Sequence, residues 1–127
     1  MCEIRFYVCE HCGNIVGMIH NAGVPMMCCG MKMTELVPNT EEASTEKHLP
    51  VVSVDGDKVV VKIGSVPHPM IEEHHIMWVY LQTDRGGQRK CLEVAKEPEV
   101  TFALADEKPL AAYAYCNLHG LWKTDIK

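Results

Sequence analysis

The chain has 127 residues, a formal net charge of −5 and 47% hydrophobic residues. This length fits one ordinary domain or a small domain joined to a medium one, with enough apolar residues for a packed core. No apolar run approaches the roughly 18–20 residues of a membrane span, and the scattered Lys and Arg residues exclude a clustered basic face for nucleic acid. The first residues lack a basic segment followed by an apolar one, which predicts no signal peptide and a cytoplasmic protein.

The first part of the chain predicts a small unit stabilised by a metal. Short strands are expected at residues 5–9 and 14–18, separated by a tight turn, and a further short stretch ends at Cys28-Cys29-Gly30. A core this small is marginal unaided, and a bound metal can supply the missing stability. Residues 36–45 are polar and acidic without periodicity, which is typical of a linker.

The rest of the chain predicts an antiparallel β-sandwich. Asp55-Gly56-Asp57 is a hairpin signature between two apolar runs, and residues 75–82 are apolar on both faces, as in a strand covered on both sides. Short strands spaced by turns are expected at residues 51–54, 58–63, 75–82, 88–94, 100–104, 110–115 and 121–126. The predicted fold class is therefore all-β.

The cysteine content indicates metal binding. The chain has seven Cys and seven His residues, and an odd count without an export signal does not favour a disulfide framework. A bridge between the neighbours Cys28 and Cys29 would be strained, because the preferred Cα separation exceeds one peptide unit. Reduced cysteines that serve as metal ligands in the cytoplasm are the better interpretation.

Four of these cysteines form the first candidate site. Cys9-x2-Cys12 places two sulfurs on one side of a turn, and Gly13 can take the positive φ that such a turn needs. With Cys28 and Cys29 the set has four thiolates, which suit Zn²⁺ or a single Fe, and spacing does not separate the two metals. Because Cys28 and Cys29 are neighbours, a distorted tetrahedron is expected. A zinc knuckle that only holds the fold is the structural alternative.

A second candidate site is dispersed over the sandwich. His68 lies between two prolines, which hold the backbone extended, and Cys116 and His119 form a C-x2-H pair. A lone His on a loop is more often a surface residue than a ligand. Together with His48 and one member of the His74-His75 pair, however, the set supplies four imidazoles and one thiolate. That exceeds a tetrahedral zinc site and suits a five-coordinate iron with one open position.

At this point the sequence resembles the desulfoferrodoxins, the two-iron superoxide reductases. The resemblance is carried, in the family's order over nearly the whole chain, by Cys9-x2-Cys12 with Cys28-Cys29, Glu46-Lys47-His48, Gly64-Ser65-Val66-Pro67-His68-Pro69-Met70, His74, and Tyr115-Cys116-Asn117-Leu118-His119-Gly120-Leu121-Trp122-Lys123. It implies a desulforedoxin-like Fe(Cys)₄ domain at residues 1–37 and an immunoglobulin-like sandwich domain at residues 38–127.

The resemblance also implies the ligands. Iron centre I would be held by Cys9, Cys12, Cys28 and Cys29, and centre II by His48, His68, His74 and His119, with Cys116 as the axial ligand. Glu46 is the residue implied to bind the oxidised iron once product has left. Lys47 would add a positive charge that attracts superoxide. His75, Cys2 and Cys91 match no ligand position.

The implied activity is the one-electron reduction of superoxide to hydrogen peroxide without production of O₂. A rubredoxin-like electron donor and a homodimer are implied as well. Two alternatives come from other classes: a non-catalytic electron-transfer or metal-binding protein with closed sites, and a superoxide dismutase. Metal content, visible spectra and the peroxide yield per superoxide distinguish them.

Overall fold

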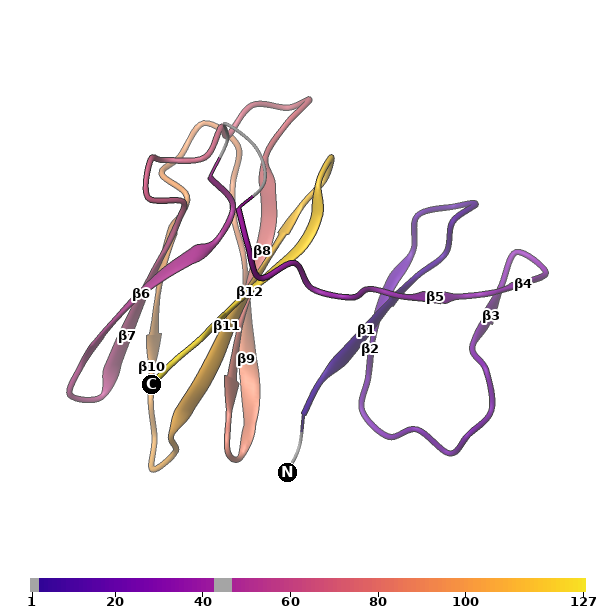
Figure 1. Ribbon diagram of the computed structural model, residues 1–127, viewed down its shortest axis with the longest axis horizontal. Helices are drawn as coiled ribbons and strands as arrows, with labels where there is room; N and C mark the ends of the chain where they lie inside the picture. Colours follow the sequence, from indigo (N-terminus) through magenta and orange to yellow (C-terminus); the bar gives the residue numbers. More distant parts are fainter. Residues whose placement is uncertain (1–2, 43–46) are drawn as a thin grey trace.

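The computed structural model describes residues 3–42 and 47–127, and its regular elements are β-strands (Figure 1). This confirms the all-β prediction. Within the described residues, no helix is long and apolar enough to cross a membrane.

Seven strands form a sandwich of two antiparallel sheets. One sheet has the order β10–β7–β6 and the other the order β12–β11–β8–β9. The strands are β6 (Pro50–Asp55), β7 (Lys58–Ile63), β8 (Ile76–Thr83), β9 (Gly86–Cys91), β10 (Glu99–Ala103), β11 (Pro109–Cys116) and β12 (Gly120–Asp125). Three strands facing four in this way is the immunoglobulin-like arrangement that was predicted.

The core between the sheets follows from alternation along the strands. In β7 the side chains of Val59, Val61 and Ile63 are fully buried, at every second position. They pack with Phe102 of β10 and with the inward residues of β8 and β11. Cys116, the last residue of β11, belongs to the same cluster and is fully buried. The core therefore extends to the end of the sheet where the Cys116 thiol lies.

A β-bulge in β8 changes which residues face the core. Tyr115 pairs with Trp78, but Cys116 pairs with Ile76, so Met77 is the extra residue. Because of this extra residue, Ile76 can point inward while Met77 remains partly exposed. The bulge keeps Cys116 and Ile76 together in the core at the edge of the candidate site.

The start of β9 differs from the expected residues 88–94. The hairpin turn is shorter than predicted, and Gly86 and Gly87 already pair with Thr83 and Gln82. At Gly87, an added Cβ would lie 2.2 Å from the Tyr80 hydroxyl oxygen. Gly87 is thus a strand residue, and its missing side chain leaves room for the Tyr80 ring. From the sequence alone, a Gly-Gly pair at this point resembles a turn.

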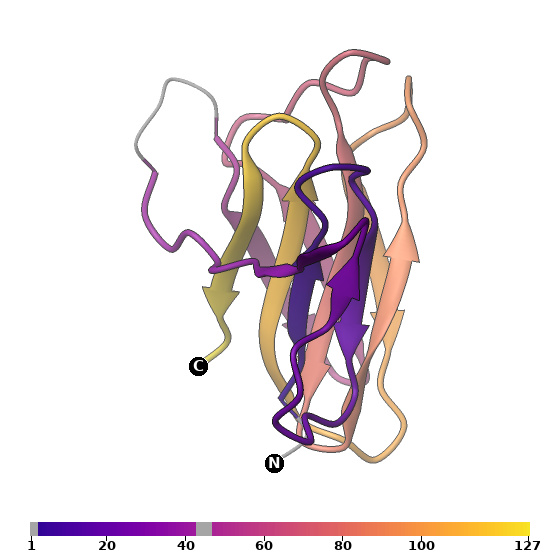
Figure 2. The same cartoon turned by 90° about the vertical axis from the view of Figure 1, so that its right-hand side faces the viewer.

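The N-terminal unit, defined here as β1–β5, lies beside the sandwich (Figures 1 and 2). It consists of a sheet of order β2–β1–β5 and a two-stranded hairpin, β3–β4. Its strands are β1 (Arg5–Val8), β2 (Ile15–Met18), β3 (Met27–Cys28), β4 (Met31–Lys32) and β5 (Thr34–Glu35). These strands are short, as expected for a unit with little core of its own.

Phe6 joins the N-terminal unit to the outer face of the β12–β11–β8–β9 sheet. Its ring centroid lies 4.8 Å from that of Trp78, 5.5 Å from Tyr80 and 6.0 Å from Tyr113. The Ile4 amide donates to Gln82 Oε1 at 3.0 Å. The aromatic residues on this face explain why residues 75–82 are apolar on both sides: one side faces the core and the other faces the N-terminal unit.

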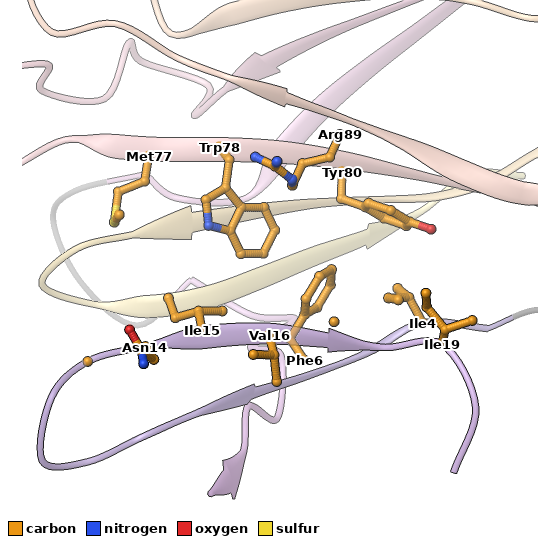
Figure 3. Close-up of a pocket in the computed structure, with 12 residues that line it drawn as sticks. Ile4, Phe6, Asn14, Ile15, Val16, Ile19, Met77, Trp78, Tyr80 and Arg89 are labelled. Carbon is orange, nitrogen blue, oxygen red and sulfur yellow. The ribbon is translucent and has the colours of Figure 1, made fainter. Parts of the chain in front are cut away.

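A groove remains between the β1–β2 hairpin and the sheet (Figure 3). Its volume is about 630 Å³, and most of its lining is apolar. Ile15, Val16 and Ile19 line it from the hairpin, while Met77 and Trp78 line it from β8. Ile19 is 97% exposed, so the groove presents apolar surface to solvent.

Candidate metal centres

The four cysteines of the N-terminal unit meet at one point. One sulfur from each of them lies within 4.8 Å of the others. Cys12 Sγ is 3.6 Å from Cys28 Sγ, and Cys28 Sγ is 4.0 Å from Cys29 Sγ. A tetrahedron with metal–sulfur bonds of about 2.3 Å has edges of about 3.8 Å. The donor chemistry and the spacing of the sulfurs therefore fit a single tetrahedral ion.

Two turns bring these sulfurs together. In the first, the Gly13 amide donates to the Cys9 carbonyl at 2.8 Å, and Gly13 has a φ of +82°. In the second, Cys29 has a φ of +52° between β3 and β4. A left-handed conformation costs a residue with a side chain roughly 1–2 kcal/mol. The left-handed conformation of Cys29 lets the two neighbouring cysteines direct both sulfurs toward one ion.

The backbone at the first turn also prepares a thiolate. The Cys12 amide approaches Cys9 Sγ at 3.5 Å, and this donor is the main reason why the pKa of Cys9 is lowered to about 6. The pKa of Cys29 is raised instead, mainly by the neighbouring Cys12 and Cys9 side chains. Four crowded thiolates repel one another, and a bound cation removes that repulsion.

The second candidate site lies at one end of the sandwich, where three connections meet (Figure 1). His48 precedes β6, and His68 and His74 lie in the connection from β7 to β8. Cys116 and His119 flank the turn between β11 and β12. Segments up to 71 residues apart in the chain thus supply one site, because the sandwich brings their loops to the same end.

The donor atoms of this site converge. One ligand atom from each of His48, His68, His74 and Cys116 lies within 4.8 Å of the others. His119 joins them: its Nδ1 is 3.1 Å from His48 Nε2 and 3.8 Å from Cys116 Sγ. Two nitrogens at right angles around one ion, each about 2.1 Å from it, lie about 3.0 Å apart. Four imidazoles and one thiolate fit a five-coordinate iron, as predicted.

The imidazoles are held by different groups. His68 Nδ1 lies 2.8 Å from the Pro69 carbonyl oxygen, which directs the other ring nitrogen toward the cluster. The Trp122 indole stacks on His48, with ring centroids 4.5 Å apart and an angle of 11° between the planes. Its Nε1 donates to the His119 carbonyl at 3.1 Å. One tryptophan therefore restrains two of the four imidazoles.

Asn117 ties the two histidine loops together. Its Oδ1 accepts from the His75 amide at 2.9 Å, and its Nδ2 donates to the Glu73 carbonyl at 3.0 Å. Both contacts fix the segment that contains His74 against the turn that contains Cys116. Asn117, which lies between Cys116 and His119, thus holds the two loops together through its side chain.

Gly64 sets the position of the backbone that leads into His48. Gly64 has a φ of +86°, and an added Cβ would lie 2.5 Å from the Lys47 carbonyl oxygen and 2.4 Å from that of Val66. The Gly64 amide also donates to the Leu49 carbonyl at 3.2 Å. The absence of a side chain at position 64 leaves room for the backbone of Lys47 on its path into the site.

Three predicted non-ligands and two predicted site residues remain to be placed. His75 lies beside His74, but its Nδ1 is 3.0 Å from the Ile71 carbonyl oxygen. Cys91 is exposed in β9, and Arg89 Nη1 lies 3.0 Å from its sulfur. Cys2 and Glu46 lie outside the described residues. Lys47 is half-buried next to His48.

Comparisons with known proteins assign the chain to a family. The family model for desulfoferrodoxin matches residues 40–125. The chain belongs to the desulfoferrodoxin family. It is 42% identical to the desulfoferrodoxin of Syntrophotalea carbinolica over 97% of each chain.

Solved structures of superoxide reductases are similar to this chain as well. The superoxide reductase from Treponema pallidum superimposes with a TM-score of 0.85 at 40% identity, covering 98% of this chain and 100% of that one. The one-iron superoxide reductase from Giardia intestinalis gives 0.57 at 32% identity, covering 65% of this chain and 99% of that one.

Sequence reasoning missed four residues that shape the second site: Glu42, Gly64, Asn117 and Trp122. Gly64, Asn117 and Trp122 lie inside motifs that carry the family resemblance, but their residue types alone did not indicate a role. Glu42 lies in a stretch that was interpreted as an acidic linker. A carboxylate six residues before a candidate ligand was the available signal.

Replacing Gly64 by Ala should disturb the histidine site more than it disturbs the fold. The left-handed φ costs roughly 1–2 kcal/mol of stability, and the contact with the Lys47 carbonyl pushes His48 out of place. Gly56→Ala is the matched control, because Gly56 has a φ of +61° and nothing within 4 Å of an added Cβ. Under conditions in which denaturant titration shows both variants to be fully folded, we expect weaker Fe²⁺ binding for Gly64→Ala alone. Equal Fe²⁺ affinities would contradict the role of Gly64.

Proposed function

We propose that this chain is a superoxide reductase, which converts superoxide, one electron and two protons into hydrogen peroxide at the His/Cys site. The observation that carries this function is the convergence of four imidazoles and the Cys116 thiolate on one point. Five donors leave one coordination position for a small ligand. The membership in the desulfoferrodoxin family and the similarity to superoxide reductases support the same activity.

Two mononuclear iron sites per chain follow from the two donor sets. Cys9, Cys12, Cys28 and Cys29 would hold one iron, and His48, His68, His74, His119 and Cys116 the other. Iron at the second site supplies one electron to superoxide when it is bound there. Four neutral imidazoles and one thiolate around Fe²⁺ leave a local charge of +1, which favours an anionic substrate although the whole chain carries −5.

The chain's own residues attract the substrate and complete the site. Lys47 adjoins His48 and contributes a cation at an end of the sandwich where Glu72 and Glu73 precede His74. Its ammonium group would raise the local concentration of superoxide. The family resemblance implies that the Glu46 carboxylate would bind the oxidised iron once product has left. A cytoplasmic location is also proposed, since reducing compartments keep ligand cysteines as thiols.

Replacing Lys47 by Ala should slow the bimolecular reaction with superoxide. We expect the rate constant to fall by roughly tenfold at low ionic strength, and its salt dependence to weaken, because electrostatic attraction is screened by salt. Pulse radiolysis at several salt concentrations measures both quantities. Lys58→Ala is the control, since Lys58 lies at the β6–β7 turn, outside the loops that contain the histidine ligands. An unchanged rate and an unchanged salt dependence would show that Lys47 does not steer superoxide.

The peroxide yield separates reduction from dismutation. A reductase gives about one hydrogen peroxide per superoxide and consumes an equivalent of donor, whereas a dismutase gives about half and needs none. With reduced rubredoxin as the donor, we expect about one peroxide and one oxidised rubredoxin per superoxide. His119→Ala should abolish this turnover, and His75→Ala should retain it. A colourless, zinc-loaded protein that consumes no superoxide would instead favour the non-catalytic alternative.

A homodimer is proposed from the apolar surface of the N-terminal unit. Ile19, Val24 and Val37 are 97%, 73% and 79% exposed, and Ile19 lies at the rim of the groove in Figure 3. Burying such residues against a second copy removes them from water. Sedimentation equilibrium should give twice the chain mass of 14.2 kDa.

Ile19→Glu should shift this equilibrium toward the monomer, because a carboxylate would be buried in the interface. Val54→Glu in the sandwich, at a position that is 49% exposed, is the control and should remain dimeric. A wild-type chain that sediments at the monomer mass at every concentration would rule the dimer out.

A further inference from the structure

Glu42 is fixed against the segment that contains His48. Its Oε1 accepts two backbone hydrogen bonds, from the His48 amide at 2.6 Å and from the Leu49 amide at 2.7 Å. The side chain is 18% exposed, although the stretch around it is acidic and polar. Two convergent amides hold a carboxylate in one orientation, so the direction of its second oxygen is set as well.

The second oxygen of Glu42 faces the imidazole of His48. Oε2 lies 3.8 Å from His48 Nδ1, and it is buried. Among the residues that the structure describes, it has no hydrogen-bond partner. A buried carboxylate oxygen is costly unless a donor satisfies it. The neighbouring donor on this side is an N–H at His48 Nδ1, which a small movement of either side chain would bring into hydrogen-bond range.

The opposite nitrogen of His48 lies in the cluster. His48 Nε2 is 3.1 Å from His119 Nδ1, and stacking on Trp122 fixes the plane of the ring. A ring whose Nε2 binds a cation carries its proton on Nδ1. The nitrogen that must carry the proton is therefore the one that faces the Glu42 carboxylate. His68 differs, because its Nδ1 faces the neutral carbonyl of Pro69.

We propose that Glu42 is the positioning residue of His48. Its carboxylate holds the imidazole with the proton on Nδ1, so that Nε2 is available to the metal. It also places a negative charge 3.8 Å from Nδ1, on the side of the ring opposite Nε2, which makes the imidazole a stronger electron donor. This inference rests on the iron site of the proposed function. It does not depend on superoxide being the substrate.

The negative charge predicts two effects that a merely structural role would not produce. Partners of this kind typically change metal affinity by about 10–100-fold. The charge also stabilises the oxidised, more positive state of the site relative to the reduced state, so it lowers the reduction potential. Neutralising the charge should therefore weaken metal binding and raise the potential at the same time.

The test compares Glu42→Gln, Glu42→Ala and Glu41→Gln in the full chain. The Gln side chain retains an oxygen for the two amides but lacks the charge, Ala lacks both, and Glu41 is an exposed neighbour. Fe²⁺ affinity is measured by competition with a chelator, and the midpoint potential by optical redox titration. We expect affinity to fall about 10-fold for Glu42→Gln and up to about 100-fold for Glu42→Ala, a higher potential for both, and no change for Glu41→Gln.

Several results would overturn the proposal. If Glu42→Gln matches Glu41→Gln in affinity and potential, the charge has no role, whether or not Glu42→Ala is impaired. If all three variants match the wild type, Glu42 does not act on His48. The absorption of the Fe(Cys)₄ site in the same sample checks folding, and Glu42→Gln keeps the backbone contacts should Glu42→Ala fail to fold. Both measurements are made without superoxide, so they remain decisive if the reductase activity itself is absent.

Discussion

The burial of Cys116 in the sandwich core is the constraint on which the histidine site depends. Alternation along β11 places Ala112, Ala114 and Cys116 on the inner side of the sheet, and all three are fully buried. Core packing thus positions the thiol independently of the loops, and the bulge at Met77 keeps Ile76 beside it. The loops that supply the imidazoles then have to converge on a point that the core has already set.

The two metal sites solve the problem of assembling ligands in opposite ways. The cysteine site is local: two turns within about twenty residues supply it, at the cost of a left-handed Cys29 and crowded thiols. The histidine site is assembled from distant segments, and the braces that hold it, such as Asn117 and Trp122, are ordinary hydrogen bonds and stacking contacts. The local site needs its metal to offset repulsion, whereas the distant site is organised largely by the fold.

This difference explains what could be predicted from the sequence. Cys-x2-Cys spacing and strand alternation are local signals, so the cysteine set and most strands were predicted from the residues themselves. The histidine ligands have no common spacing, and the resemblance to a family was needed to choose His74 over His75 and to name the substrate. Gly64 and Trp122 act through contacts with residues that are distant in the chain. Glu42 acts through a contact with His48 that depends on how the backbone between them folds. Their roles are visible only in the three-dimensional structure, where all three lie next to His48 or the residue before it.

His48 is the residue at which these long-range contacts are concentrated. Trp122 restrains the plane of its ring, Glu42 faces its outer nitrogen, and Gly64 admits the backbone that precedes it. The segment that leads into β6 also contains Lys47. Every contact that fixes the backbone of His48 therefore also fixes the position from which the Lys47 side chain extends. The coupling has a physical consequence: the electron-donating strength of one ligand and the charge that attracts the substrate are set by the same short stretch of backbone. A change in this stretch would therefore alter metal binding and substrate attraction together, whereas a change around Cys116 would alter the metal site alone.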